Sequence, residues 1–160
     1  MPVKQLQDFL NRRNIKYVTI SHSAAYTAQE IAASARISGK ELAKTVIVKV
    51  NGDMAMAVLP ACYMIDFDLL KEAAAVNKVE LASEEEFKDK FSECEVGAMP
   101  PFGNLYGMDV FVADTLAEDE EIAFNCGSHT ELIQMSYKDF EETVKPQIVK
   151  FSSPQRSAAQ

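Results

Sequence analysis

The sequence predicts a single α+β domain built on a mixed, mostly antiparallel sheet. Several short apolar strand segments follow one another, with helical segments inserted irregularly rather than in regular β-α-β alternation. The pair Asn51-Gly52 separates two such segments and is a strong signal for a β-hairpin. A chain of 160 residues suits one domain with a sizeable core. We expect this domain to span residues 1–151, with residues 152–160 forming a polar, disordered tail.

The N-terminal elements are predicted from periodicity and capping signals. Leu6, Phe9 and Leu10 lie at helical spacing within a helix over residues 3–14, and residues 15–21 alternate as a strand. Thr27-Ala28-Gln29-Glu30 is a capping box that opens a helix to about residue 35. The two strands of the predicted hairpin cover residues 45–50 and 54–59.

The C-terminal elements follow the same logic. Ser83-Glu84-Glu85-Glu86 is a second capping box, and Ser136 is expected to cap the last helix. The predicted helices cover residues 68–76, 84–91 and 137–144, and the predicted strands cover residues 79–81, 110–113, 122–125, 132–135 and 148–151.

The composition is that of an ordinary globular protein, with 48% hydrophobic and 25% charged residues. No apolar segment approaches the roughly 18 residues that span a bilayer, and the N-terminus lacks the apolar core of a signal peptide. Three cysteines without C-x-x-C spacing predict reduced thiols in a cytoplasmic protein. They argue against a disulfide framework and against a zinc site, and no cofactor motif occurs, so we expect neither metal nor cofactor.

The charge of the chain is unevenly distributed. Residues 1–50 hold eight basic and three acidic side chains, a net +5, while the rest holds eight basic and 21 acidic ones, a net −13. A basic third on an acidic body suits contact with a polyanion such as a nucleic acid. The alternative is that these charged side chains merely form solvent-exposed helix faces and bind nothing.

A proline-stiffened loop, Gly97-Ala98-Met99-Pro100-Pro101-Phe102-Gly103, is the most informative segment. Two prolines fix φ at about −65° and remove two backbone donors, which excludes helix interior and central strand. Glycines at both ends let another group approach the main chain closely. We expect a rigid loop that is presented rather than buried and that holds a ligand; the alternative is a structural turn.

Two further segments carry reactive side chains. Lys44 stands at the entrance of the first hairpin strand, where its ammonium points into a cleft or is simply solvated. Phe124-Asn125-Cys126-Gly127-Ser128-His129 is a strand that runs into a Gly-Ser turn ending in histidine. Cys126 with His129 is an alternative thiol nucleophile and base, although cysteine is more often a small buried hydrophobe. His22 and Tyr26 either line the same cleft or belong to a surface loop.

Together, Lys44-Thr45 opening a hairpin, the proline-stiffened loop, and Gly127-Ser128-His129 followed by Asp139-Phe140 resemble the YbaK family. This is the editing domain also associated with prolyl-tRNA synthetase. The resemblance covers about residues 3–151 and implies a curved sheet surrounded by helices. It also implies an aminoacyl-tRNA deacylase, a hydrolase that serves translation fidelity by removing wrongly attached amino acids.

The resemblance implies roles for the matching positions. Lys44, Gly103 and His129 correspond to the residues that carry activity. Substrate-binding positions are expected among the neighbours of these residues, namely His22, Tyr26, Thr45, Ala98, Met99, Pro100, Pro101, Phe102, Gly127 and Ser128. Cys126 departs from the pattern, because a smaller residue is more usual there.

The sequence thus predicts a trans-editing hydrolase of aminoacyl-tRNA esters. A methylene group is worth only about 1–3 kcal/mol in selectivity, so a rigid pocket that excludes larger side chains is useful, and we expect alanine, serine or threonine as the amino acid removed. The expected partner is the aminoacylated 3′ end of tRNA, supplemented by a synthetase or an elongation factor. Alternatives are a non-catalytic module that binds charged tRNA or a synthetase, and a small-molecule esterase that uses Cys126.

Overall fold

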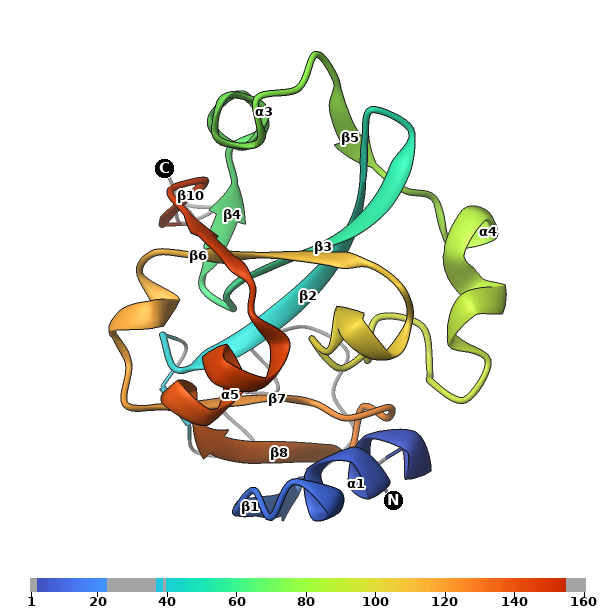
Figure 1. Cartoon of the computed structure of the whole chain (residues 1–160), viewed down its shortest axis with the longest axis vertical. Coiled ribbons are helices and arrows are strands. Elements are labelled where there is room, and N and C mark those ends of the chain that lie inside the picture. The colour runs from blue at the N-terminus through green and yellow to red at the C-terminus, as the bar shows by residue number, and fades with distance from the viewer. Residues whose placement is uncertain (1–2, 23–36, 39, 155–160) are drawn as a thin grey trace.

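The computed structural model of the chain describes residues 3–22, 37–38 and 40–154 (Figure 1). The helix predicted from Thr27 onward, together with Tyr26, lies outside these residues. None of the helices in the described part has the length and apolar character that a membrane span requires.

An eight-stranded mixed sheet forms the centre of the molecule. Its order is β1-β8-β7-β2-β3-β6-β9, and β5 pairs with the outer half of β2. The pairs β1–β8, β7–β8, β2–β3 and β2–β5 are antiparallel, whereas β2–β7, β3–β6 and β6–β9 are parallel. The strands are β1 (Tyr17–Ser21), β2 (Leu42–Val50), β3 (Asp53–Pro60), β5 (Val79–Leu81), β6 (Asp109–Ala113), β7 (Glu121–Asn125), β8 (Glu131–Ser136) and β9 (Gln147–Val149). The predicted α+β class with a mixed, mostly antiparallel sheet is confirmed.

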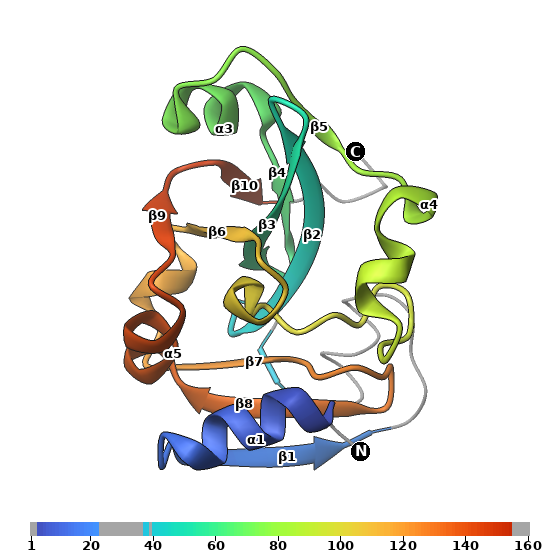
Figure 2. The same ribbon diagram turned by 45° about the vertical axis from the view of Figure 1, so that its right-hand side comes forward.

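Helices surround this sheet where capping signals place them. Asp66 and Ser136 each accept a hydrogen bond from a backbone N–H of the first turn, and Ser83 forms the predicted capping box with Glu86. In both views α1 and α5 lie near β7 and β8, while α3 lies at the opposite end beside β5 (Figures 1 and 2). The helices are α1 (Lys4–Arg12), α3 (Phe67–Ala74), α4 (Glu84–Phe87) and α5 (Tyr137–Val144).

The β2–β3 hairpin and the neighbouring strand β7 position the candidate site. Asn51 and Gly52 both have positive φ, +50° and +90°, which matches the turn type predicted for Asn-Gly. On its other side, β2 pairs with β7 through only two residue pairs, Leu42 with Ala123 and Ala43 with Phe124. This short parallel ladder, called the seam below, joins the β1-β8-β7 group to the rest of the sheet.

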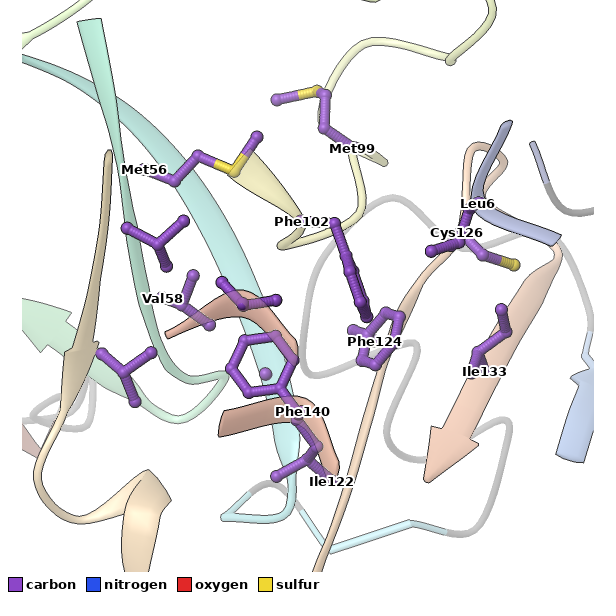
Figure 3. Close-up of a cluster of buried hydrophobic side chains, with 14 of the residues drawn as sticks. Leu6, Met56, Val58, Met99, Phe102, Ile122, Phe124, Cys126, Ile133 and Phe140 are labelled. Atoms are coloured by element: carbon purple, nitrogen blue, oxygen red, sulfur yellow. The ribbon is translucent and has the colours of Figure 1, made fainter. Parts of the chain in front are cut away.

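The main core fills one face of the sheet and has an aromatic centre. Phe102 is fully buried, with ring centroids 5.5 Å from Phe124 and 5.5 Å from Phe140 (Figure 3). Leu6 and Leu10 bring α1 onto the same cluster. The opposite face carries a second cluster around Leu59, Leu70 and Phe111, beneath α3.

The prediction of a disordered tail from residue 152 onward is wrong for residues 152–154. Ser152–Pro154 form strand β10, which pairs antiparallel with β4 (Tyr63–Ile65). Phe151 is fully buried, and its carbonyl accepts a hydrogen bond from the Asp66 N–H at 2.7 Å. The polar sequence concealed this pairing because β4 is too short and too distant in the chain to give a local signal. Residues 155–160 lie outside the described part.

Candidate active site

Three hydrogen bonds join residues 95–98, which lead into the proline-stiffened loop, to the Gly-Ser-His turn. The Gly127 N–H donates to the Ala98 carbonyl at 2.9 Å, and the Glu95 N–H donates to the Gly127 carbonyl at 2.8 Å. The His129 ring nitrogen Nε2 lies 2.8 Å from the Val96 carbonyl oxygen. Two segments that are separated by about thirty residues in the sequence therefore form one rigid unit.

The contact with Val96 fixes the state of the His129 ring. A carbonyl oxygen only accepts hydrogen bonds, so Nε2 must carry the proton and donate it. The side chain is 7% exposed, and a Glu95 carboxylate oxygen lies 4.0 Å from the same nitrogen. In the neutral ring, Nδ1 is therefore the nitrogen without a proton, and it is a buried atom.

Gly97, rather than Gly103, is the loop glycine that faces the histidine. A Cβ atom on Gly97 would lie 3.5 Å from His129 Cε1. A Cβ atom on Gly103 would lie 2.5 Å from the Met108 carbonyl oxygen, inside the fold. Gly103 therefore packs closely against the fold, and its predicted contact with substrate stays a prediction. Gly97 is the loop glycine next to the His129 ring, and its place at the start of the loop was the only signal for this in the sequence.

We expect Gly97→Ala to impair activity, whereas Gly52→Ala in the β2–β3 turn will not. Both glycines have similar positive φ values, +86° and +90°, so both variants should lose about 1 kcal/mol of unfolding free energy. Only the methyl group at position 97 lies against the His129 ring, since nothing surrounds position 52 within 4 Å. Denaturant unfolding and deacylation assays of both variants check this. Equal activity of the two would show that Gly97 has only a backbone role.

The rest of the loop is buried, which corrects the expectation that it is presented. The side chains of Met99 and Phe102 are core residues (Figure 3), and Pro100 and Pro101 are buried between them. Ala98 is also fully buried. The rigidity predicted from the proline pair therefore serves to seat the loop on the core. Contact of these positions with substrate stays a prediction, and residues 95–98 are the part that meets the turn.

Lys44 and Thr45 point to opposite faces of the sheet. Lys44 pairs with Leu59 in the unbroken β2–β3 ladder, and Leu59 belongs to the second cluster. Its neighbour Thr45 pairs with Val58 of the main core and is half-buried. Thr45 thus stands on the face that Phe102 fills, and its predicted contact with substrate stays untested.

Lys44 is a half-buried ammonium without a carboxylate partner among the described residues. Burial lowers its pKa below the ordinary value for lysine, and the nearby Cys62 opposes this shift. Lys49, on the same strand, shows the opposite behaviour. Its Nζ lies 2.7 Å from Glu86 and 3.5 Å from Glu80, and the hydrogen bond to Glu86 is the main cause that raises its pKa. A lysine that is desolvated and unpaired is typical of a functional site.

The strand β7 connects the neighbourhood of Lys44 with the Gly-Ser-His turn. The seam ends at the pair Ala43–Phe124, so Lys44 and Asn125 are the next residues on the two strands. From Asn125 the chain reaches His129 in four residues, which span at most about 14 Å. The cooperation of Lys44 and His129 on one substrate remains a prediction.

Of the remaining predicted residues, Ser128 and His22 lie at the end of the sheet that carries the Gly-Ser-His turn. Ser128 belongs to the turn, where its hydroxyl oxygen lies 3.2 Å from the Thr130 hydroxyl. His22 follows β1, and its backbone N–H donates to the Thr130 carbonyl at 2.9 Å, which brings it to the same end of the sheet. Tyr26 lies outside the described residues.

Cys126 is unsuited to the alternative thiol mechanism. Its side chain is fully buried, and burial is the main cause that raises its pKa to about 12. The thiol donates weakly to the Glu131 carbonyl at 3.5 Å. Because the thiolate is the nucleophilic form, a thiol with such a pKa is inert near neutral pH.

The geometry agrees with what comparison of the sequence shows. Residues 22–143 match the family model of the aminoacyl-tRNA editing domain. The chain therefore belongs to the aminoacyl-tRNA editing domain family, which confirms the resemblance predicted from the three motifs. Among curated proteins, no sequence matches the chain.

Solved structures share this fold at low sequence identity. A hypothetical protein superposes with a TM-score of 0.84 at 22% identity, over 94% of this chain and 100% of its own. A protein described provisionally as a trans-editing enzyme for prolyl tRNA synthetase gives a TM-score of 0.80 at 16% identity, over 94% and 96% of the two chains. A signal transduction protein, also provisionally described, from Marinobacter aquaeolei VT8 gives 0.74 at 17% identity, over 95% of this chain and 31% of its own. At such identities the likeness shows the fold alone.

Proposed function

We propose that this protein is a trans-editing hydrolase that removes a small, wrongly attached amino acid from tRNA in the cytoplasm. The observation that carries the proposal is the half-buried ammonium of Lys44, which has no carboxylate partner in the part of the chain that the structure describes. Lys44 stands one residue beyond the seam, on the strand beside β7. A fixed positive charge of this kind stabilises the negative charge that develops when an ester carbonyl is attacked.

The chemistry requires little beyond this charge and a placed water molecule. An aminoacyl ester is already activated, and a neighbouring ribose hydroxyl assists its hydrolysis, so no protein nucleophile is needed. In this proposal Lys44 holds the ester carbonyl or the terminal phosphate. Backbone groups around Gly97 approach the substrate, and His129 orients a hydroxyl group or water through Nδ1. The reaction as proposed uses no metal or organic cofactor.

The amino acid removed is proposed to be alanine, serine or threonine. A loop seated on a packed core yields little to a larger side chain, and overpacking such a surface costs about 1–3 kcal/mol. The decisive experiment measures hydrolysis of a panel of mischarged tRNAs. We expect the fastest turnover with the smallest side chains. A preference for a bulky aromatic residue would contradict the size argument, and binding of charged tRNA without hydrolysis would indicate a non-catalytic module.

The basic residues at one end of the molecule suit the acceptor stem. Lys4, Arg12, Arg13 and Lys16 are exposed, and none forms an ion pair within the described residues. Helix α1 begins at the Gly-Ser-His turn, where the Val3 N–H donates to the Cys126 carbonyl at 2.9 Å. Its nine residues span about 14 Å, so Arg12 stands well away from the turn. This separation suits stem phosphates, because an unpaired 3′ end lies between them and the ester.

Replacing Arg12 and Lys16 together by glutamine should weaken tRNA binding severalfold at low salt and leave kcat unchanged. Each lost phosphate contact lowers the slope of log K against log salt by about one. The matched control replaces Lys71 and Lys150, which are exposed elsewhere, and changes net charge equally. Titrations at several salt concentrations check this. Equal weakening in both variants would show that net charge, and not this surface, governs binding. The acidic remainder of the chain favours a supplementary partner, a synthetase or an elongation factor.

A further inference from the structure

Asn125 shares a sheet face with Lys44 at the point where the seam ends. In the seam, Leu42 and Ala123 both belong to a small third cluster, whereas Ala43 and Phe124 both belong to the main core. Successive side chains of a strand alternate between faces. Lys44 and Asn125, the next residues on the two strands, therefore both point to the face opposite the main core.

The Asn125 carboxamide has an unsatisfied oxygen. Its Oδ1 atom is buried, and no donor reaches it from any residue that the structure describes. Buried side-chain oxygens are nearly always hydrogen-bonded, so this oxygen has the capacity to accept from a donor outside the described residues. Among the other buried oxygens without donors, Ser152 Oγ lies on β10, away from the seam.

We propose that Asn125 Oδ1 accepts a hydrogen bond from the α-amino group of the aminoacyl ester. This inference rests on the proposed function and adds the subsite that recognises the amino end of the substrate. An α-amino group keeps at least two N–H donors whether it is protonated or neutral. An acceptor on the same sheet face as Lys44, one residue beyond the seam, orients the ester in this proposal so that its carbonyl, rather than its amino group, faces the ammonium.

The neutral charge of asparagine is essential to this arrangement. An aspartate at position 125 would also accept from the amino group, but its charge would attract the Lys44 ammonium, which has no carboxylate partner among the described residues. That pairing would neutralise the charge that the ester carbonyl requires. A carboxamide accepts the hydrogen bond without competing for the ammonium.

The test compares two substrates on one variant. The first is alanyl-tRNA, and the second is the same tRNA esterified with propionate, which is alanine without its amino group. We expect Asn125→Ala to lower kcat/KM for alanyl-tRNA about tenfold, the worth of one hydrogen bond to a charged group. Asn125→Ala should leave kcat/KM for propionyl-tRNA unchanged. The control variant Gln147→Ala removes a carboxamide from the edge strand β9, and it should leave kcat/KM unchanged for both substrates.

The outcomes distinguish a failure of the proposed role of Asn125 from a failure of the proposed function. An equal loss with both substrates, or no loss with alanyl-tRNA, would overturn the role of Asn125, because partial unfolding lowers both rates equally. If wild-type protein hydrolyses no ester of the mischarged panel, the proposed function itself fails. Should Asn125→Ala not fold, Asn125→Leu, which keeps the side-chain shape, allows the same comparison.

Discussion

Lys44→Ala should lower the rate of deacylation by about 10²–10³-fold, because one oriented charge at a developing oxyanion contributes roughly 3–4 kcal/mol. The fold should persist, since Lys44 lies on an otherwise intact ladder and its half-buried ammonium has no carboxylate partner among the described residues. Removing this unpaired charge is expected to leave the midpoint of thermal unfolding unchanged or slightly raised. Single-turnover deacylation and thermal melts of the same preparation check both statements.

Lys49→Ala is the matched control for this variant. It removes a lysine from the same strand, but one that already pairs with Glu86 and Glu80. We expect wild-type activity and a loss of less than about 1 kcal/mol in unfolding free energy, as is usual for surface ion pairs. A Lys44→Ala variant with near wild-type turnover would contradict the proposed role of the ammonium.

The lowered pKa of Lys44 predicts how activity depends on pH if the charged ammonium is required for the reaction. Burial lowers this pKa, so the ammonium loses its proton at a lower pH than an ordinary lysine does. Activity that requires the charged form should therefore fall on the alkaline side, as pH rises through the lowered pKa. Stability responds in the opposite sense. Between the lowered pKa and the ordinary value, the unfolded chain binds the proton more readily, so this group destabilises the fold less as pH rises.

Phe102→Ala should lower the free energy of unfolding by about 3–5 kcal/mol, the usual range for removing a buried phenyl ring. The ring is 0% exposed and packs edge-on against Phe140 at 5.5 Å, with Phe9 at 6.1 Å. For a domain of this size the midpoint of thermal unfolding should fall by roughly 6–20 °C. Denaturant titration measures the loss directly.

Val96→Ala provides the comparison within the same segment. Val96 is 47% exposed, so its truncation should change unfolding free energy by less than about 0.5 kcal/mol. If Phe102→Ala kept wild-type stability while losing activity, Phe102 would be a substrate-contacting residue, as the sequence pattern suggested, and not a core residue.

Local signals in the sequence predicted most of the elements. The Asn51-Gly52 turn, the capping box at Ser83 and the cap at Ser136 each specify the backbone within a few residues, so neighbouring side chains suffice to reveal them. Strand β10 escaped because Ser153 and its neighbours read as a polar tail, and only pairing with a distant three-residue strand orders them.

The sequence predicted which residues belong to the candidate site better than it predicted how they are arranged. His129 and the loop do meet, but sequence spacing alone could not decide which loop residues face the turn. Two prolines make a loop rigid whether it packs on the core or is exposed to solvent. The burial of Phe102 therefore could not be predicted without knowing that its ring packs against Phe124. Asn125 was missed because its significance lies in the register of β7 against β2. An asparagine that ends an apolar strand, four residues before the histidine, was the only hint.

The seam has a consequence for how selectivity evolves. Only two residue pairs join β7 to β2, and the aromatic rings of Phe124, Phe102 and Phe140 pack against one another on the main-core face of this seam. Under the proposed function, exchanging one of these buried rings for one of slightly different size would shift the strands that carry Lys44 and Asn125. It would alter which amino acid is preferred without replacing either side chain.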